Sequence, residues 1–378
     1  MNILYIAEDI SLPGFHGGST HTSETINSLV ELGHNVTIIC KKEPKQKDIE
    51  IIDKIKYIRL ALPKKSLQKN WILFFNLGKI VSEILKKEKI DLVWERNRIF
   101  GNQGIIVGKK HGCKTLIEMH EPINMFETNK TFLLIKKWFF HTIKFADKVY
   151  IQHKNEGKGI EAKKLILSSN GANPKKFNPK ISGAKISKKL SKKKFRFFYS
   201  GSFQPWHCLD KTILAFNKIN NTNKDLEFLL AGEGPQKDKL QKLVKSKKIN
   251  NVVFLGNIEK NKLAAYINKS NACLALFDRE YPPIKKYDYF YSPVKVFEYL
   301  ACKKPIIASN IGNLKKILSN NINGLLVNEQ NVNEISSAMQ KLINNNKLLL
   351  KLGENNLKEF KSKYTWDKIN TKIIEAFK

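Results

Sequence analysis

The stretch SPVKVFEYLACKKPIIASNIGNLKKILSNNINGLLV, residues 292–327, joins an apolar helical pattern to two short apolar strands. Ser292 is predicted to cap the helix, and Pro293 to lie in its first turn, where no backbone N–H is needed. Apolar residues face almost every direction of the helix, so we expect it to be buried. The free N–H groups and the dipole at such a helix start favour an anion. The stretch therefore predicts an α/β fold with a site suited to phosphate.

One carboxylate lies inside this apolar helix. Glu298 follows Lys295 by three residues, so both side chains project from one face. A buried carboxylate must be paired, protonated or hydrogen-bonded. A salt bridge with Lys295 and a hydrogen bond to a ligand hydroxyl both satisfy this need, and the stretch alone leaves the two open.

Strands and helices alternate on both sides of a break near residues 170–194. Strands are predicted at 3–7, 35–40, 55–60, 91–95, 115–119, 148–152 and 165–168, and again at 195–199, 227–230, 252–255, 272–277, 305–308 and 324–327. Helical patterns occur near 19–32, 71–87 and 131–145. Such alternation predicts two doubly wound, Rossmann-like parallel sheets.

The break sets the domain boundaries. It contains turn formers, two prolines and a dense basic run, which are typical of a linker. We predict an N-terminal domain at 1–175, a basic linker at 176–194 and a C-terminal domain at 195–360. With 378 residues, the chain is long enough for two cores.

Composition indicates a cytoplasmic protein. The N-terminus reads as a strand and shows no signal-peptide pattern. The apolar stretch at 71–85 is interrupted by polar residues well short of the roughly 20 that a membrane span requires. The five cysteines are scattered and form no C-x-x-C pair, which argues against a disulfide framework and a zinc site.

The net charge of +33 admits two interpretations. Lysine recurs together with Asn and Ile throughout, which favours a general compositional bias. A real anionic partner, such as phosphate or anionic lipid, is the alternative. Nucleic acid is not favoured, because no module of aromatic and basic residues for reading bases is visible.

Three glycine-bearing turns follow predicted strands. They are Gly17-Gly18, Gly201-Ser202 and Gly232-Glu233-Gly234-Pro235. Glycines there let backbone amides approach a ligand closely, although a plain turn explains each one alone. Two of these turns and the start of the 292–301 helix are predicted to share one edge of the second sheet, which makes that edge the strongest site candidate.

Two features of the first half have open interpretations. His120 lies between Glu118 and Glu121 just past a strand, so we expect a raised pKa and either a proton-donor role or a structural hydrogen bond. The segment 131–140 mixes aromatic and basic residues as an interfacial helix does, but core packing also explains it.

At this point the chain resembles the GT-B glycosyltransferases, specifically the retaining family 4 group that uses nucleotide sugars. The resemblance covers nearly the whole length. It rests on the Gly17-Gly18 loop, ELGHNVTII, SNGANPKKFNP, YSGSFQPWH, AGEGP, VVFLGNI, SPVKVFEYLACKKPIIAS and NGLLV. It implies two Rossmann-like domains facing a cleft, with the nucleotide sugar held by the C-terminal domain and the acceptor by the N-terminal one. It also implies that the last helix, about 361–378, packs back on the N-terminal domain.

The family motifs transfer to this sequence residue by residue. Glu298 matches the Glu that binds the ribose hydroxyls, whereas Phe290 stands where another Glu is usual. Ser202 and His207 stand where the family has diphosphate-binding Arg and Lys, and Cys208 replaces a usual Gly. The expected donor-binding residues are Gly17, Gly18, Gly201, Ser202, His207, Gly232, Gly234, Pro235, Ile258, Pro293, Val294, Lys295, Val296 and Glu298, and the expected catalytic residues are Glu298 and His120.

The resemblance implies retaining transfer of a hexosyl group from a nucleoside diphosphate sugar to an acceptor hydroxyl. A helix N-terminus and nearby cations would stabilise the leaving diphosphate. The cations are either Lys295 together with a protonated His207, or Lys295 without it, in which case the enzyme would have lower activity. No metal and no other cofactor is expected. A glycan or lipid-linked acceptor of the cell envelope, with peripheral contact to an anionic inner membrane, fits the family. The alternative is a non-catalytic GT-B protein that binds a nucleotide or a partner.

Overall fold

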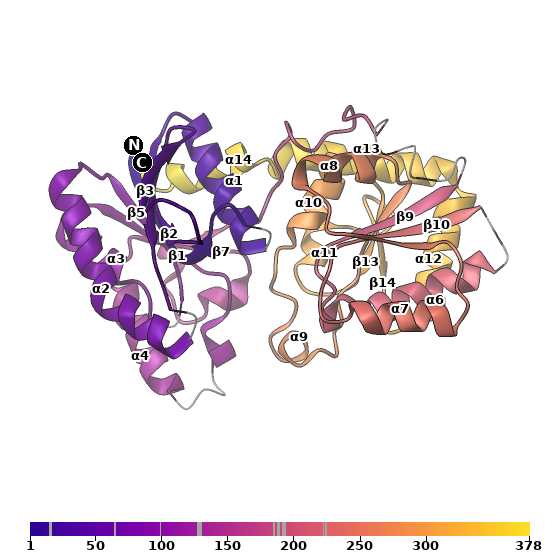
Figure 1. The fold of residues 1–378 in the computed structure, drawn as a ribbon, viewed down its shortest axis with the longest axis horizontal. Helices are drawn as coiled ribbons and strands as arrows, with labels where there is room; N and C mark the ends of the chain where they lie inside the picture. The colour runs from indigo at the N-terminus through magenta and orange to yellow at the C-terminus, as the bar shows by residue number, and fades with distance from the viewer. Residues whose placement is uncertain are drawn as a thin grey trace. The chain divides into compact units, whose positions relative to one another are not determined.

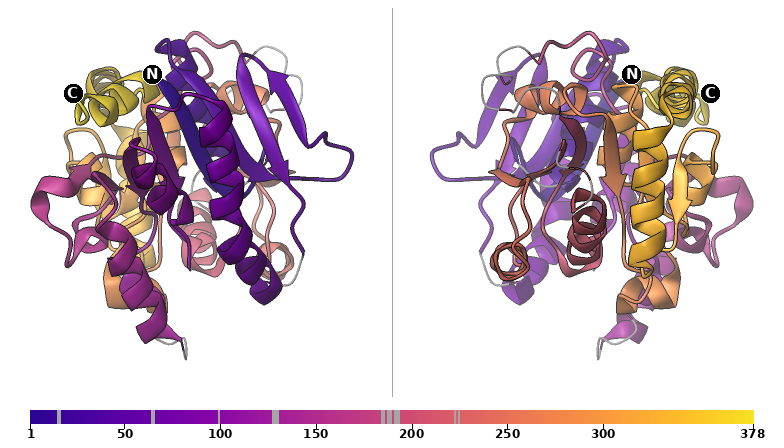
Figure 2. Two further views of the ribbon diagram at one scale, coloured as in Figure 1. Left: turned by 90° about the vertical axis from the view of Figure 1, so that its left-hand side faces the viewer. Right: turned by 90° about the vertical axis from the view of Figure 1, so that its right-hand side faces the viewer.

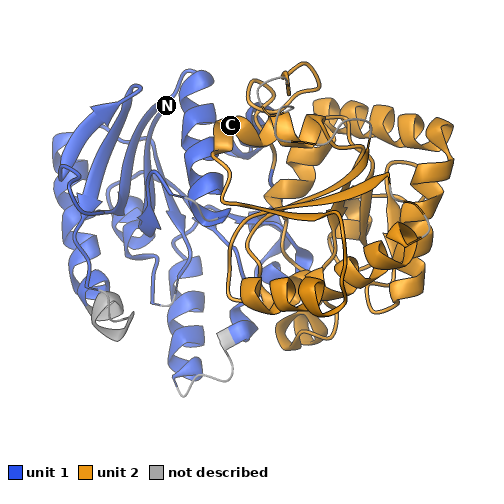
Figure 3. Cartoon of the chain, turned by 45° about the vertical axis from the view of Figure 1, so that its right-hand side comes forward, with its two compact units in different colours: residues 1–170, 366–378 blue, residues 171–365 orange. Residues whose placement is uncertain are grey.

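The computed structural model describes residues 1–14, 17–63, 66–98, 100–126, 131–183, 186, 190, 194–221, 223 and 225–378. The chain divides into two compact units, residues 1–170 with 366–378 and residues 171–365 (Figure 3). The boundary between the units after residue 170 lies five residues before the predicted end of the N-terminal domain at 175. Within the predicted linker at 176–194, residues 184, 185, 187–189 and 191–193 lie outside the described residues.

Unit 1 contains an eight-stranded sheet in the order β3-β4-β2-β1-β5-β6-β7-β8 (Figure 1). Its strands are β1 (Asn2–Ser11), β2 (Asn35–Lys41), β3 (Ile49–Ile52), β4 (Ile55–Leu60), β5 (Leu92–Arg96), β6 (Lys114–Glu118), β7 (Lys148–Ile151) and β8 (Leu165–Leu167). All neighbours are parallel except β3 and β4, which pair antiparallel. The sheet is thus parallel, as predicted, except at this edge.

Helices cover both faces of the unit 1 sheet. They are α1 (Gly17–Glu31), α2 (Ser66–Lys87), α3 (Gln103–Lys110), α4 (Phe132–Ile143) and α14 (Trp366–Glu375). One face packs on α1 and α14 through Ile26, Leu29 and Ile369. The other packs on α2, α3 and α4, with Leu77 and Ile135 in the same core (Figure 2). The final helix of the chain therefore belongs to unit 1.

Unit 2 contains a six-stranded parallel sheet in the order β11-β10-β9-β12-β13-β14. Its strands are β9 (Phe195–Ser200), β10 (Leu226–Ala231), β11 (Val252–Gly256), β12 (Ala272–Ala275), β13 (Ile306–Ser309) and β14 (Leu325–Val327). Counted from β9, this is the 3-2-1-4-5-6 order of the Rossmann fold. The order reverses between β9 and β12, so the carboxyl ends of these two strands mark the ligand-binding position of such sheets.

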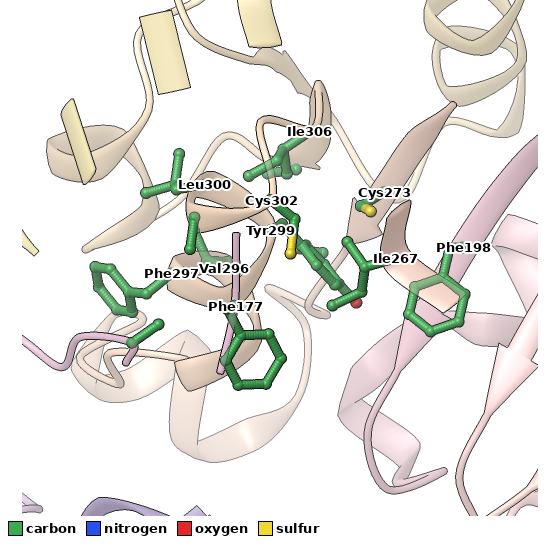
Figure 4. Close-up of a cluster of buried hydrophobic side chains, with 14 of the residues drawn as sticks. Phe177, Phe198, Ile267, Cys273, Val296, Phe297, Tyr299, Leu300, Cys302 and Ile306 are labelled. Atoms are coloured by element: carbon green, nitrogen blue, oxygen red, sulfur yellow. The ribbon is translucent and has the colours of Figure 1, made fainter. Parts of the chain in front are cut away.

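Two helical layers enclose the second sheet. Its helices are α6 (Leu209–Asn220), α7 (Lys237–Ser246), α8 (Lys260–Asn268), α9 (Pro282–Tyr287), α10 (Val294–Ala301), α11 (Leu314–Ile317), α12 (Val332–Asn344) and α13 (Asn346–Lys363). The α10 side chains Val296, Phe297, Tyr299 and Leu300 are buried in one core with Phe198 of β9 (Figure 4). The prediction that α10 is buried is confirmed.

Every predicted strand is present, with ends within two residues of the predicted ones, except that β1 continues four residues beyond its predicted end, to Ser11. The structure adds β3, α3 and α9, none of which the sequence patterns indicated. Within the described part of the chain, no helix is both long enough and apolar enough to span a bilayer.

Candidate functional site

Lys295 places a cation at the point where the strand order of unit 2 reverses. Its Nζ lies 4.1 Å from the centre of the Tyr199 ring on β9 and 5.4 Å from that of Phe277, just past β12. The amine is buried and makes no hydrogen bond to any described residue. Burial lowers the pKa of Lys295 to about 7, although the Glu298 carboxylate opposes the shift. A ligand that brings negative charge here would meet an amine that has no hydrogen-bond acceptor among the described residues.

The glycine turns fit closely around this amine. A Cβ atom at position 201 would come within 2.6 Å of Lys295 Nζ, and Gly201 has φ +140°. A Cβ at position 232 would lie 2.0 Å from the Gly201 carbonyl oxygen, at φ +138°. Gly234 packs equally closely on the backbone of Phe203. Side chains at these positions would collide with backbone or with the amine, so the glycines are required by close approach.

The start of α10 differs from the prediction. Pro293, not Ser292, is the cap residue, with φ −73° and ψ 115°, and the helix begins at Val294. Because Pro293 is extended, it stands before the first turn rather than in it, and no side chain caps the helix. Val294 and Val296 flank Lys295 in that turn, so the predicted donor-binding residues 293–296 do lie at a helix start.

Tyr299 ties α10 to the end of β9. Its hydroxyl accepts a hydrogen bond from the Ser200 backbone N–H at 2.9 Å and lies 3.0 Å from Ser200 Oγ. The contact holds the helix start against the Gly201 turn. Glu298 precedes Tyr299 and is 6% exposed. Lys295 Nζ makes no hydrogen bond to Glu298 or to any other described residue.

Of the two alternatives considered for His207, the lowered pKa disfavours the one in which it is a cation near pH 7. It lies in the short 3-10 helix Pro205–His207 and is buried. Burial, and then the nearby Lys295 charge, lower the pKa of His207 well below its usual range. Its Nδ1 lies 2.6 Å from the Ser202 carbonyl and 2.8 Å from the Tyr199 hydroxyl, which are structural contacts.

The remaining predicted donor residues occupy the same edge of the sheet. Ser202 is exposed, Pro235 precedes α7, and Ile258 is half-buried just past β11. Phe290 is fully buried and stacks on Tyr291, with ring centres 4.2 Å apart. Its carbonyl accepts a hydrogen bond from Asn313 Nδ2 at 2.7 Å, which fixes the loop before α10. The packing of Phe290 is that of a core residue.

Unit 1 carries the other three predicted residues at its own sheet edge. Gly17 and Gly18 begin α1, and a Cβ at Gly18 would lie 3.7 Å from Arg96 Nη2 at the end of β5. A Cβ at Gly17 would meet nothing within 4 Å. His120 follows β6, the strand beside β5.

A buried carboxylate, Glu118, organises the surroundings of His120. Tyr5 and Trp94 each donate a hydrogen bond to its Oε2 at 2.6 Å. Arg96 donates to its Oε1 at 3.1 Å, and the Nε2 atoms of His120 and His21 lie 2.6 and 2.5 Å from that same oxygen.

The prediction of a raised pKa for His120 is wrong. Burial, helped by the Arg96 charge, lowers the pKa of His120 to about 4. Burial also opposes ionisation of Glu118, but the facing His21 and His120 hold its pKa well below the usual range. Glu118 is therefore an anion and His120 is neutral near pH 7.

One group of side chains could hold a metal ion. The ligand atoms of His21, Glu118 and His120 lie within 4.8 Å of one another, and no other group of this kind occurs among the residues described. Sequence patterns did not reveal it, because His21 comes from α1, whereas Glu118 ends β6 and His120 lies two residues beyond that strand. Tyr199 and Phe277 were likewise missed as partners of Lys295, since each is an ordinary apolar residue of a strand or its end.

Two family models match the chain. The model described as "Glycosyl transferases group 1" matches residues 183–359, and the one described as "Glycosyltransferase Family 4" matches residues 15–154. The first contains the glycine turns and α10, and the second contains α1 and the Glu118 neighbourhood.

Curated relatives carry related names. An uncharacterised glycosyltransferase of Methanocaldococcus jannaschii is 24% identical over 94% of this chain and 93% of its own length. A second one from that organism is 29% identical, but over only 45% of this chain and 44% of its own length. The GPI3 subunit of a phosphatidylinositol N-acetylglucosaminyltransferase from Saccharomyces cerevisiae is 20% identical over 89% of this chain and 74% of its own.

Solved structures share the fold. Sucrose-phosphate synthase from Thermosynechococcus elongatus superposes with a TM-score of 0.77 at 20% identity, covering 100% of this chain and 98% of the other. HepE from Anabaena, solved in complex with UDP-glucose, gives 0.73 at 15% identity and covers 100% and 99%. The protein therefore has the GT-B fold. It belongs to the family 4-like GT-B glycosyltransferases, whose class of reaction is glycosyl transfer.

Proposed function

We propose that this protein is a retaining glycosyltransferase that moves a hexosyl group from a nucleoside diphosphate sugar to an acceptor hydroxyl. The observation that carries the proposal is the Lys295 amine, which is buried, has no hydrogen-bond partner in the part of the chain that the structure describes, and lies beside the Gly201 turn. A diphosphate there would supply the missing acceptors and meet the free N–H groups at the start of α10.

The leaving diphosphate is the group that requires stabilisation during the reaction. In the proposed mechanism Lys295 and the backbone of residues 293–296 bear its developing charge. Glu298, three residues along the helix, would accept hydrogen bonds from the ribose. No divalent metal is assigned to this step. Retention of configuration rests on the family resemblance.

A panel of nucleotide sugars tests the proposal directly. Thermal unfolding is measured with each UDP, GDP and ADP sugar, because a ligand that binds only native protein raises the apparent stability. Release of the nucleoside diphosphate is then followed with the stabilising donor and candidate acceptors. The proposal fails if no nucleotide sugar stabilises the protein.

A non-catalytic nucleotide-binding protein remains the second candidate, and two observations favour it. His207 is neutral and Phe290 is packed in the core, so two positions expected to touch the diphosphate and the sugar bear no charge. Tight donor binding without hydrolysis or transfer, across a broad acceptor panel, would support this candidate.

A lipid-linked or glycan acceptor at an anionic inner membrane is the proposed setting. Leu133 and Leu134 of α4 are 70% and 60% exposed, and Phe75 of α2 is 61% exposed. Lys136 and Lys137 follow Leu134 on α4, so the exposed apolar start of this helix has cations next to it. Apolar side chains with adjacent cations are what a peripheral contact with an anionic membrane requires. The α4 helix thus combines a buried side, expected from core packing, with an exposed apolar end.

A further inference from the structure

The strongest unexplained feature of unit 1 is the convergence of three ligand atoms. His21 Nε2 and His120 Nε2 lie 2.5 and 2.6 Å from one oxygen, Glu118 Oε1. Both nitrogens are buried, and neither has a hydrogen-bond partner of accepted geometry among the described residues. The three ligand atoms lie within 4.8 Å of one another, close enough to be drawn around a single ion.

The atoms behind these three are already held in place. His21 Nδ1 lies 2.5 Å from Asn170 Oδ1, which also accepts a hydrogen bond from Gln152 Nε2 at 3.2 Å. Because that oxygen is an acceptor, His21 carries a proton on Nδ1, and its Nε2 is free to coordinate. Tyr5 and Trp94 occupy Glu118 Oε2 and leave Oε1 facing the histidines. Metal-binding histidines and carboxylates typically have such outer partners.

Arg96 is the one feature that opposes a metal, because it donates to the same Oε1 at 3.1 Å. A carboxylate oxygen has two lone pairs, so it can accept from Arg96 and still coordinate an ion. The oxygen can therefore serve Arg96 and an ion together.

We propose that His21, Glu118 and His120 form a binding site for a divalent transition metal in unit 1, with Zn²⁺ as the best-matched ion. Two imidazole nitrogens and one carboxylate oxygen are a ligand set that zinc uses, with a fourth position left for water or a ligand. The site is separate from the diphosphate chemistry assigned to unit 2, and it does not depend on the proposed function.

The test measures binding of the metal itself, without any sugar substrate. Untagged full-length protein is stripped with a chelator, and Zn²⁺ binding is followed by competition with a chromogenic chelator. Co²⁺ serves as a spectroscopic probe, since imidazole ligands give it visible absorption bands. We expect one saturable ion per chain.

Substitutions then locate the ion. His120→Asn and His21→Asn should abolish saturable binding, whereas His111→Asn, on an exposed histidine at the end of α3, should leave it unchanged. Asn170→Ala should weaken affinity by roughly 10- to 100-fold, as loss of an outer partner does. Circular dichroism of the metal-free variants checks the fold, and the half-buried His120 keeps the test valid if the buried His21 variant fails to fold.

Two outcomes would overturn the proposal. The first is wild-type protein that binds neither ion saturably, which would make the cluster a set of hydrogen-bonding groups only. The second is equal binding by wild type and His120→Asn, which would place the ion elsewhere, for example on the cysteines. Either result leaves the assignment of sugar transfer intact, because that assignment rests on unit 2.

Discussion

Replacing Lys295 with methionine should weaken donor binding and at the same time stabilise the protein. Methionine keeps the length of the side chain and removes the buried amine. In the free protein this amine makes no hydrogen bond to a described residue, so its lost hydration is not replaced by hydrogen bonds. A diphosphate would provide the compensation. The two effects therefore have opposite signs, which a merely structural lysine would not produce.

The size of each effect follows from the contacts. A hydrogen bond between charged groups contributes roughly 1.5–3 kcal/mol. Since 1.4 kcal/mol is about a tenfold change in affinity, Lys295→Met should weaken nucleotide-sugar binding by roughly 10- to 150-fold. An unsatisfied buried polar group costs about 1–3 kcal/mol, so the ligand-free variant should gain up to that much stability. For a unit of this size, each kcal/mol raises the melting temperature by roughly 2–4 °C.

The effect on stability should depend on pH in a defined direction. Burial lowers the pKa of Lys295 from 10.5 to about 7 in the folded protein. Between these values the unfolded chain holds more protons, so the stability of the wild type rises with pH across the interval. The advantage of Lys295→Met is full below about pH 7 and disappears above about pH 10.5. Donor affinity should fall as pH rises above about 7, because the free amine loses its charge.

Lys304 provides a matched control. It is also a buried lysine with a lowered pKa, but it donates hydrogen bonds to the carbonyls of Asn268 and Ser270 at 3.0 and 2.8 Å. Lys304→Met should lower the melting temperature and leave donor affinity unchanged. Calorimetric titration with a nucleotide sugar and thermal unfolding at several pH values measure both quantities. Unchanged donor affinity in Lys295→Met, or a loss of stability equal to that of Lys304→Met, would refute the reasoning.

Three further predictions concern other elements. Gly232→Ala should unfold or strongly destabilise unit 2, because the new Cβ would lie 2.0 Å from a carbonyl oxygen, whereas Gly17→Ala should leave the melting temperature unchanged. Glu298→Gln should raise the KM for the nucleotide sugar at least tenfold, as expected when an ionised acceptor of the ribose hydroxyls becomes neutral; an unaltered KM would remove Glu298 from the site. Leu134→Glu should reduce cosedimentation with anionic vesicles, and binding that ignores both lipid charge and salt would contradict the proposed membrane contact.

Strand positions could be predicted because each buried parallel strand is a short apolar run with turn residues at its ends. The runs at 195–199 and 227–230 are such cases, and both strands lie where expected. By contrast, β3 consists of Ile49, Glu50, Ile51 and Ile52, which are mostly exposed on an edge strand. Because β3 is not buried, its sequence lacks the apolar pattern by which a core strand is recognised. The short helix α3 was missed for a related reason, since two glycines interrupt its apolar face.

Site geometry could be predicted only where backbone requirements appear in the sequence. The glycines at 201, 232 and 234 indicated close packing, and the structure shows a backbone or amine contact at each one. Protonation states could not be obtained in the same way. The sequence shows the carboxylates next to His120, but only the fold brings Arg96 and a buried environment to it, and these reverse the direction of its pKa shift.

The structure also gives a physical reason for the uncharged residues at 202 and 207. Lys295 reaches the Gly201 turn from α10, so its amine is near the end of β9, just before these two positions. Burial, and then the charge of Lys295, lower the pKa of His207, so a second cation at residue 207 would be disfavoured by both effects. In the proposed mechanism a single cation from α10 would therefore replace, rather than join, cations from the β9 turn. Lys295→Met combined with His207→Lys tests this exchange: if one cation suffices, the double variant should recover part of the donor affinity that Lys295→Met loses, whereas no recovery would show that the amine must approach from α10.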